Sequence, residues 1–320
     1  MRGVVLDLDT LHPGDLSLDA LRASLPDWQL YAATTPADTV ARLADCQVAV
    51  TNKVVIDRQA MQASPQLRLI CVSATGTNNV DLDAAAEQGI VVCNVRDYAA
   101  ASLAQHVFAL LLALATRWHE YAADVRAGEW SRSPMFCLMH RPVMELAGKT
   151  LGIIGYGVLG QEVARLAQAF GMRVLVSDSL RPAAMAQAGR TPLASLLQQS
   201  DVISLHCPLD TGTAKLVNKD FLAAMKPGAL LINTARGGLV DEEALKQALV
   251  SGQLAGAALD VLSVEPPPAD HVLLDPAIPN LIITPHNAWV SRECRQRLLD
   301  GVVANIEGWK VGAPVSAVVS

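Results

Sequence analysis

Short runs that are mostly apolar alternate with Ala- and Leu-rich stretches along nearly the whole chain. The runs predicted to be strands are 4–8, 48–52, 67–73, 90–94, 151–155, 173–178, 201–206, 229–235, 256–261 and 281–285. A strand that is apolar at every position must be covered on both faces, and helical crossovers make neighbouring strands parallel. The alternation therefore predicts an α/β fold of doubly wound parallel sheets with helices on both faces.

Length and composition limit the class of protein. With 320 residues the chain favours two domains, and its content of 51% apolar and 18% charged residues excludes a disordered protein. The net charge of −6 disfavours a nucleic-acid partner. The scattered cysteines indicate neither disulfides nor a metal site. The N-terminus lacks the apolar run of a signal peptide, and the longest apolar run, 107–115, is too short to span a membrane. We therefore expect a soluble, cytoplasmic protein.

A glycine-rich turn, GYGVLG (155–160), follows the predicted strand 151–155 and opens a helical stretch. In this G-x-G-x-x-G spacing Gly155 permits the tight turn, and Gly157 lets a diphosphate approach the backbone. Gly160 lets the helix pack on the strand. The N–H groups at the start of the helix favour phosphate. The motif therefore predicts a dinucleotide site.

The acid Asp178 ends the next predicted strand, 173–178. A carboxylate at this point accepts hydrogen bonds from the adenosine ribose hydroxyls and repels a 2′-phosphate. We therefore expect NAD(H) as the cofactor in preference to NADP(H). Arg181 lies close by in the sequence and leaves some NADP(H) use open. The plain alternative for Asp178 is an aspartate in a surface turn.

The place of the glycine motif predicts the domain organisation. It begins near residue 150, after several α/β units, and only a short segment follows the last predicted strand. We predict a cofactor domain, 99–286, inserted into a smaller substrate domain made of 1–98 and 287–320. The helical stretch 99–130 has more apolar positions than one helix face needs. It is expected to pack either in its own core or on a second subunit, as a dimerisation arm near 99–145 of a homodimer.

Motifs spread over essentially the whole chain resemble those of the D-isomer-specific 2-hydroxyacid dehydrogenase family. They are ATGTNNVDL (74–82), GYGVLG (155–160), HCPL (206–209), NTARGGLVDE (233–242), ALDVLSVEPP (258–267) and TPHNA (284–288). The first motif and the segment ELAGKTLGIIGYG (145–157) look most like the glycerate dehydrogenase, or hydroxypyruvate reductase, branch. The resemblance implies a Rossmann cofactor domain and a flavodoxin-like substrate domain. It also implies NADH-dependent reduction of hydroxypyruvate or glyoxylate to D-glycerate or glycolate.

The resemblance implies three catalytic residues, and their chemistry suits reduction of a 2-keto acid. The guanidinium of Arg236 matches a carboxylate and never loses its charge. Histidine exchanges protons near neutral pH, so His286 is the expected proton donor. Glu265 is its expected partner, which orients the ring and favours its charged form. The structural alternatives are a surface ion pair, a packed histidine and a turn glutamate.

The remaining site residues follow from the same motifs. The loop of Ala74, Thr75 and Gly76 is expected to bind the substrate carboxylate, with Thr75 also near the nicotinamide. Asn52 and Lys53 are a further candidate polar contact, with a solvated lysine as the alternative. The other expected cofactor contacts are Val158, Leu159, Cys207, Pro208, Thr234, Ala235, Arg236, Asp260, His286 and Ala288. The histidines expected to be structural are His106, His140 and His206.

Two alternatives to this function stay open. The enzyme could reduce another 2-keto acid, such as pyruvate, because sequence patterns do not resolve the shape of the substrate pocket. A non-catalytic, NAD-sensing protein of the corepressor type would also keep Arg236, Glu265 and His286. Consumption of NADH with a panel of keto acids separates the enzyme from the sensor.

Overall fold

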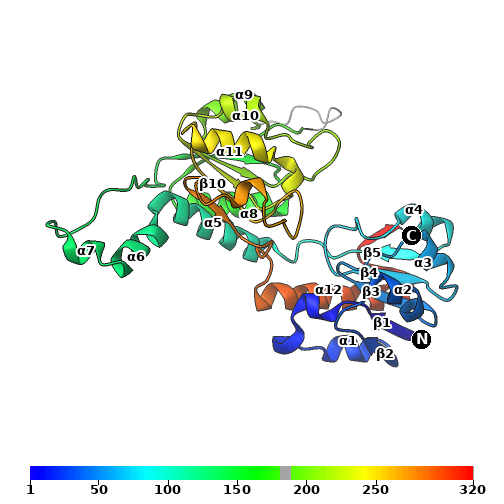
Figure 1. The fold of residues 1–320 in the computed structure, drawn as a ribbon. Helices are drawn as coiled ribbons and strands as arrows, with labels where there is room; N and C mark the ends of the chain where they lie inside the picture. Colours follow the sequence, from blue (N-terminus) through cyan, green and yellow to red (C-terminus); the bar gives the residue numbers. More distant parts are fainter. Residues whose placement is uncertain (181–188, 320) are drawn as a thin grey trace. The chain divides into compact units, whose positions relative to one another are not determined.

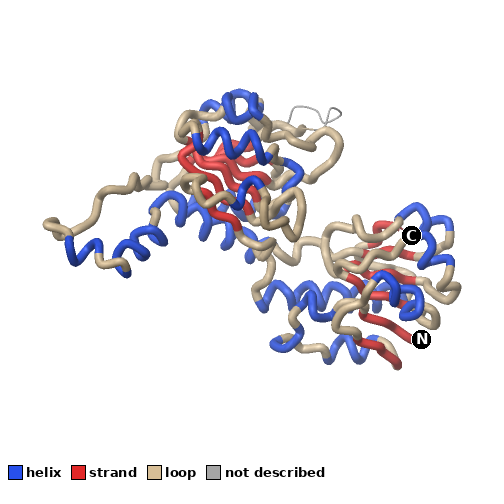
Figure 2. Tube along the Cα trace, viewed as in Figure 1, coloured by secondary structure: helices blue, strands red, loops and turns tan. Residues whose placement is uncertain are grey.

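The computed structural model describes residues 1–180 and 189–319. The chain forms two compact units. Residues 1–99 and 289–320 make one, here called the terminal unit, and residues 100–288 make the other, the central unit. Each unit contains a six-stranded sheet flanked by helices (Figures 1 and 2). The expected doubly wound α/β class is therefore confirmed in both units.

The sheet of the terminal unit has the strand order β12-β5-β4-β3-β1-β2. Strands β1 to β5 are parallel, in the flavodoxin-like order 2-1-3-4-5, and β12 joins β5 in antiparallel fashion. Its strands are β1 (Arg2–Val5), β2 (Asp27–Leu30), β3 (Val48–Thr51), β4 (Leu69–Val72), β5 (Val91–Cys93) and β12 (Ala317–Val319). Its helices are α1 (Asp19–Ser24), α2 (Pro36–Leu43), α3 (Arg58–Gln62), α4 (Leu82–Glu87) and α12 (Arg292–Lys310).

The sheet of the central unit is parallel throughout, in the order β11-β10-β9-β8-β6-β7. Its strands are β6 (Thr150–Ile154), β7 (Arg173–Val176), β8 (Val202–Leu205), β9 (Ala229–Asn233), β10 (Leu254–Leu259) and β11 (Leu281–Ile283). The helices around it are α5 (Ala100–Thr116), α8 (Val158–Ala169), α9 (Leu193–Gln199), α10 (Lys219–Ala224) and α11 (Glu242–Val250). The strand order reverses between β6 and β8, and ligands of such sheets bind at that point.

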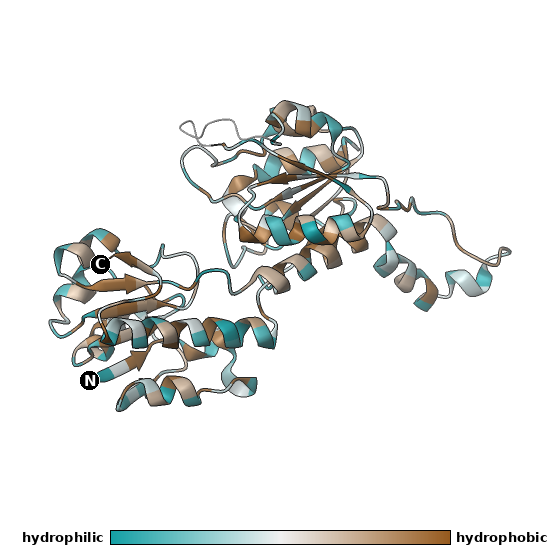
Figure 3. Cartoon of the chain, turned by 180° about the vertical axis from the view of Figure 1, so that it is seen from behind, coloured by the Kyte–Doolittle hydropathy of each residue, from teal (hydrophilic) through white to brown (hydrophobic). Residues whose placement is uncertain are grey.

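Burial on both faces explains the apolar runs. Strands β3, β4, β6, β8 and β9 are buried at every position, and Figure 3 shows the hydrophobic colour of the strands. In the central unit, α5 and α8 contribute to one core cluster, and α9, α10 and α11 contribute to another. The two clusters are consistent with helices on both sides of the sheet.

The sequence patterns missed two strands and misplaced one. The missed strands β2 and β12 lie at the edges of their sheet and are only partly buried, so they lack a continuous apolar run. The run 4–8 was expected to be a strand, but β1 ends at Val5 and a 3-10 turn covers Leu8–Leu11. The buried carboxylate of Asp7 causes the change of direction, since it accepts the backbone N–H groups of residues 52–54.

The expected helical stretch 99–130 forms three helices. After α5, Arg117 adopts a left-handed conformation, and the chain continues as α6 (Trp118–Arg126) and α7 (Glu129–Arg132). Helix α5 is largely buried, whereas α6 and α7 bury no residue and project from their unit (Figure 1). Among the described residues no single helix is long and apolar enough to cross a membrane; α5 and α6 reach that length only as a pair bent by 60°.

The contact between α8 and β6 gives a test of fold stability. A Cβ atom on Gly160 would lie 2.2 Å from the carbonyl oxygen of Gly155, so the backbone would have to move. We expect Gly160→Ala to lower the free energy of unfolding by about 1–3 kcal/mol. Gly157→Ala is the matched control, because its Cβ would meet nothing within 4 Å. Urea unfolding measures both, and equal stability of the two variants would contradict the packing role of Gly160.

His206, directly after β8, predicts a pH dependence of stability. Burial lowers the pKa of His206 to about 4, and its Nε2 lies 2.9 Å from Ser204 Oγ. In the unfolded chain a histidine titrates near 6.5, so between pH 6.5 and 4 only the unfolded chain binds this proton. Stability should therefore rise with pH through that window, by up to about 3 kcal/mol.

The His206→Gln variant isolates this contribution, because glutamine keeps a polar group near Ser204 and does not titrate. Urea unfolding of wild type and variant at several pH values between 4 and 7.5 measures the two slopes. We expect a shallower slope in the variant; two parallel curves would show that His206 is not the titrating group.

Candidate active site

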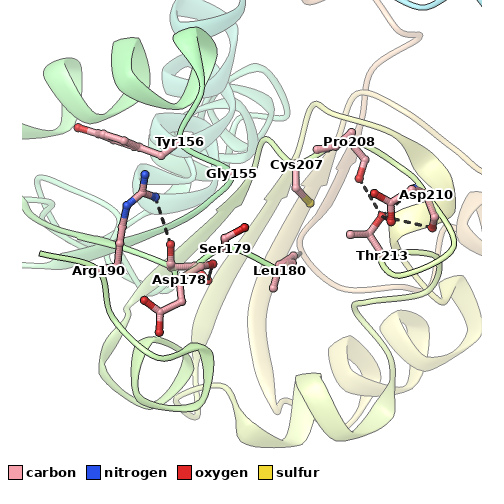
Figure 4. Close-up of a pocket in the computed structure, with 11 residues that line it drawn as sticks. Gly155, Tyr156, Asp178, Ser179, Leu180, Arg190, Cys207, Pro208, Asp210 and Thr213 are labelled. Atoms are coloured by element: carbon pink, nitrogen blue, oxygen red, sulfur yellow. Dashed lines mark hydrogen bonds between the residues drawn. The ribbon is translucent and has the colours of Figure 1, made fainter. Parts of the chain in front are cut away.

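A pocket lies at the carboxyl ends of β6, β7 and β8, where the strand order reverses (Figure 4). Its lining residues are Gly155, Tyr156, Ser177, Asp178, Ser179, Leu180, Arg190, Cys207, Pro208, Asp210 and Thr213. Four residues expected to contact the cofactor, Gly155, Asp178, Cys207 and Pro208, thus meet in one place. Sequence patterns did not single out Tyr156 and Arg190. Arg181, considered above for NADP(H), lies outside the described residues.

The glycine turn has the shape that a diphosphate needs. Gly155 has a φ of 96°, and a Cβ there would lie 2.4 Å from the backbone of His206 and Cys207. Only glycine fits such a position. Gly157 leaves open space above the turn, and α8 begins at Val158. The first N–H groups of a helix, here those of Val158 and Leu159, have no partner within the helix and can bind phosphate oxygens. The turn therefore fits the diphosphate of a dinucleotide cofactor.

The residues after β9 present a guanidinium. Asn233 holds the turn, since its side chain donates to Arg236 O at 2.9 Å and accepts the Ala235 N–H at 3.0 Å. Arg236 is exposed, and its Nη1 donates to Ala235 O at 2.7 Å. It forms no ion pair within the described part of the chain, so it can receive an anionic ligand. The buried hydroxyl of Thr234 has no hydrogen-bond partner among the described residues, which also suits a polar ligand.

His286 and Glu265 form a direct pair. Nδ1 of His286 lies 2.6 Å from Oε2 of Glu265, and both side chains are about one-third exposed, 35% and 36%. An ionised carboxylate only accepts hydrogen bonds, so Nδ1 carries the hydrogen. Glu265 is itself fixed through Oε1, which accepts the Leu262 N–H at 2.9 Å. The imidazole is therefore oriented by Nδ1, and Nε2 is the atom suited to proton transfer.

Asp260 holds the turn that carries His286. Its carboxylate is 1% exposed and accepts the Thr284 hydroxyl at 2.6 Å and the N–H groups of Asn287 and Ala288 at 2.9 Å each. Burial raises the pKa of Asp260, but hydrogen bonds from His106, Thr284 and the backbone outweigh it, so its pKa lies below the usual value. Asp260 is thus an ionised support. Its expected contact with the cofactor stays a prediction.

Three supporting residues were missed or misjudged in the sequence. His106, expected only to pack in its helix, places Nε2 3.0 Å from the Thr284 hydroxyl. Glu242 accepts the N–H and hydroxyl of Ser263 at 2.8 and 2.6 Å and lies 3.1 Å from His271 Nε2. This pair fixes the loop that leads to Glu265. The one sequence signal for these three residues was the position of Glu242 in the motif NTARGGLVDE. Hydrogen bonds between residues so far apart in the sequence leave no spacing pattern.

The other two histidines have structural contacts. His140 lies 3.1 Å from Asp124 of α6, on the surface of the projecting segment. His206 bonds to Ser204 within its own strand end. Neither contact involves Arg236, Glu265 or His286.

The substrate-loop candidates belong to the terminal unit. Lys53 follows β3, and the 74–76 loop follows β4. Because these strands are parallel neighbours, both segments lie at the same end of that sheet. The Asn52 side chain is buried and donates to Thr10 Oγ1 at 3.1 Å, and the Thr75 hydroxyl donates to Val95 O at 3.0 Å. Both side chains thus shape their loops, and their roles toward a ligand stay predictions.

The chain is similar to known proteins over most of its length. Residues 108–288 match the family described as D-isomer specific 2-hydroxyacid dehydrogenase, NAD binding domain. The chain is 45% identical to a glycerate dehydrogenase of Methylorubrum extorquens, over 91% of this chain and 92% of that protein. It is 41% identical to a hydroxypyruvate reductase of Blautia hydrogenotrophica, over 99% of each.

A solved structure of an acyclic imino acid reductase, in complex with NADPH and D-Arg, superposes with a TM-score of 0.85 at 28% identity and covers 100% of both chains. The similarity to named relatives extends over nearly the full length at more than 40% identity. The resemblance of the motifs is therefore confirmed: the chain belongs to the D-isomer-specific 2-hydroxyacid dehydrogenase family.

Proposed function

We propose that the chain is an NADH-dependent reductase that converts hydroxypyruvate to D-glycerate, with glyoxylate as a second substrate that gives glycolate. The observation that carries the proposal is the His286–Glu265 pair at 2.6 Å. These residues follow β11 and β10, and β10 neighbours β9, which is followed by Arg236, a residue with no ion pair among the described residues. Relatives named glycerate dehydrogenase and hydroxypyruvate reductase, at 45% and 41% identity, support the choice of substrate.

Each side chain of the proposed site has a separate role in keto-acid reduction. The guanidinium of Arg236 binds the substrate carboxylate and polarises the ketone. In the terminal unit, the N–H groups of the loop formed by Ala74, Thr75 and Gly76 are proposed to bind a substrate carboxylate, and Lys53 adds positive charge. The nicotinamide, when bound, supplies a hydride to the carbonyl carbon. Protonated His286 then gives its Nε2 proton to the forming alkoxide.

Glu265 keeps the ring in place during this transfer. Its carboxylate holds Nδ1–H while Nε2 loses and regains a proton, so the imidazole cannot turn away from the substrate. His286 is about one-third exposed, which lets its proton be replaced from water after each turnover. The balanced reaction consumes one keto acid, one NADH and one proton and yields one hydroxy acid and NAD⁺.

The cofactor contacts are part of the same proposal. Val158 and Leu159 bind the diphosphate at the start of α8, and the backbone of Cys207 and Pro208 flanks the adenosine. Asp178 binds the ribose hydroxyls and favours NADH. The residues of the central unit proposed to lie near the nicotinamide are Thr234, Ala235, Asp260, His286 and Ala288.

A substrate panel tests the function. NADH absorbance is followed with hydroxypyruvate, glyoxylate, pyruvate and 2-ketobutyrate, and we expect the highest kcat/KM with hydroxypyruvate. His286→Ala should lower kcat by about 100-fold or more, because the proton donor is lost. His140→Ala, a surface histidine paired with Asp124, is the matched control.

Binding of NADH, measured by fluorescence, separates loss of chemistry from loss of folding in His286→Ala. The absence of NADH consumption with all four acids would contradict the reductase. A wild-type kcat in His286→Ala would instead contradict the role of this histidine while leaving the reaction in place.

We also propose that the protein is a homodimer joined through an arm, defined as α6, α7 and residues 133–145. Large apolar side chains are exposed along it: Trp118, Val125, Trp130, Met135, Phe136, Met139 and Val143. Phe136 is 85% exposed, and apolar patches of this kind mark interaction surfaces. Arg141 bonds to Asp124 at 2.9 Å and to Tyr121, which keeps the returning chain beside α6.

The arm predicts a change of oligomeric state. Replacing Phe136 and Met139 together by serine removes two of its most exposed apolar side chains and should shift a dimer toward monomer at micromolar concentration. Val311→Ser is the control, since Val311 is 79% exposed at the end of α12, outside the arm. Sedimentation velocity measures the masses; a monomeric wild type, or a double variant as dimeric as the control, would overturn the proposal.

A further inference from the structure

Arg190 occupies a position in the cofactor pocket that the mechanism above does not use. It lines the pocket together with Gly155 and Asp178 (Figure 4). Its Nη1 donates to Ser177 O at 3.2 Å, and its guanidinium lies 5.0 Å from the centre of the Tyr156 ring. Tyr156 is the second residue of the glycine motif. Two contacts, one polar and one aromatic, therefore hold this cation beside the turn that fits the diphosphate.

Arg190 is partly buried, yet it has no acidic partner in the described part of the chain. Among the described residues no carboxylate lies within ion-pair distance of its guanidinium, and its Nη1 donates to the Ser177 carbonyl oxygen. The segment 181–188, RPAAMAQA, contains no acidic residue by sequence. Arg295, which is buried, is instead paired with Asp15 at 2.7 Å. A guanidinium has five N–H donors, so Arg190 keeps most of its donors for a ligand.

The place of Arg190 identifies which part of a cofactor it faces. The carbonyl that holds it belongs to Ser177, the residue before Asp178, and Asp178 stands where a ribose-binding acid is expected. The diphosphate has a separate binding element, the start of α8. Arginine matches phosphate oxygens in charge and geometry. The anion expected beside the adenosine ribose is a 2′-phosphate.

We propose that Arg190 receives the 2′-phosphate of NADP(H), so that Asp178 and Arg190 together set the ratio of NADH to NADPH use. The inference rests on the proposed cofactor site and extends it. Asp178 repels the 2′-phosphate and binds the ribose hydroxyls, whereas Arg190, supported by Tyr156, offsets that repulsion. The enzyme then accepts NADPH as a second cofactor, and either residue can be changed to move the ratio.

Calorimetric binding of two nucleotides tests the inference without any keto acid. ADP carries the diphosphate, and 2′,5′-ADP carries the 2′-phosphate. Arg190→Gln keeps an N–H donor for the Ser177 carbonyl and should weaken 2′,5′-ADP by about tenfold or more, because a charged hydrogen bond is lost. The same variant should weaken the binding of ADP less than the binding of 2′,5′-ADP. Asp178→Ala should instead strengthen the binding of 2′,5′-ADP.

Arg173→Gln is the matched control. Arg173 begins β7, at the end of the strand opposite to Asp178, and is exposed, so its loss removes one positive charge without touching the pocket. We expect this variant to leave the affinity for both nucleotides unchanged. An equal loss of affinity for both nucleotides in Arg190→Gln would place Arg190 on the diphosphate and overturn the proposal. An unchanged affinity for 2′,5′-ADP would also overturn it.

Kinetics give a second reading with hydroxypyruvate as substrate. The ratio of kcat/KM for NADPH to kcat/KM for NADH should fall about tenfold in Arg190→Gln and less in Arg190→Lys, which keeps the charge. An unchanged ratio in Arg190→Gln would contradict the proposal. If no keto acid is reduced, the proposed function fails, and nucleotide binding still decides the role of Arg190.

Discussion

The buried carboxylate of Asp260 is the interaction on which the active site depends most. It accepts bonds from the Thr284 hydroxyl and from two successive backbone N–H groups, those of Asn287 and Ala288. These bonds close a turn around His286, whose φ of 52° lies in the left-handed region. Such a conformation is uncommon for a residue with a side chain and persists only where its surroundings fix it. Asp260 therefore sets the direction in which the imidazole leaves the sheet.

The same kind of support occurs at the other two side chains proposed to be reactive. Asn233 closes the turn that presents Arg236, and Glu242 with His271 fixes the loop that leads to Glu265. In each case a buried or partly buried polar side chain binds backbone groups, while the reactive side chain stays exposed to ligand. Rigid support of this kind limits the loss of geometry that weakens catalysis. It also explains why the carboxylate of Asp260 and the amide of Asn233 are tolerated inside the unit, since both are hydrogen-bonded.

Most of the fold could be predicted because its causes are local. A strand covered on both faces is apolar throughout, so the central strands appeared as runs. The edge strands β2 and β12 are partly exposed and gave no such run. Asp7 ended the first strand earlier than its apolar run, because its carboxylate binds backbone groups some 45 residues away in the chain. Contacts of that separation depend on which strands become neighbours, which local patterns do not encode.

The sequence by itself determined the α/β class, the dinucleotide turn and the family, and it predicted Arg236, Glu265 and His286 as the reactive residues. Gly155 and Gly160 show why: a Cβ at either would strike the backbone, so the residue type alone reports the geometry. Only the tertiary structure decided which polar residues support them, since His106 and Thr284 meet across 178 positions. It likewise brought Arg190 to Tyr156 beside Asp178. The order of the strands in the sheet determines which distant residues come into contact, and residue spacing in the sequence does not predict that order.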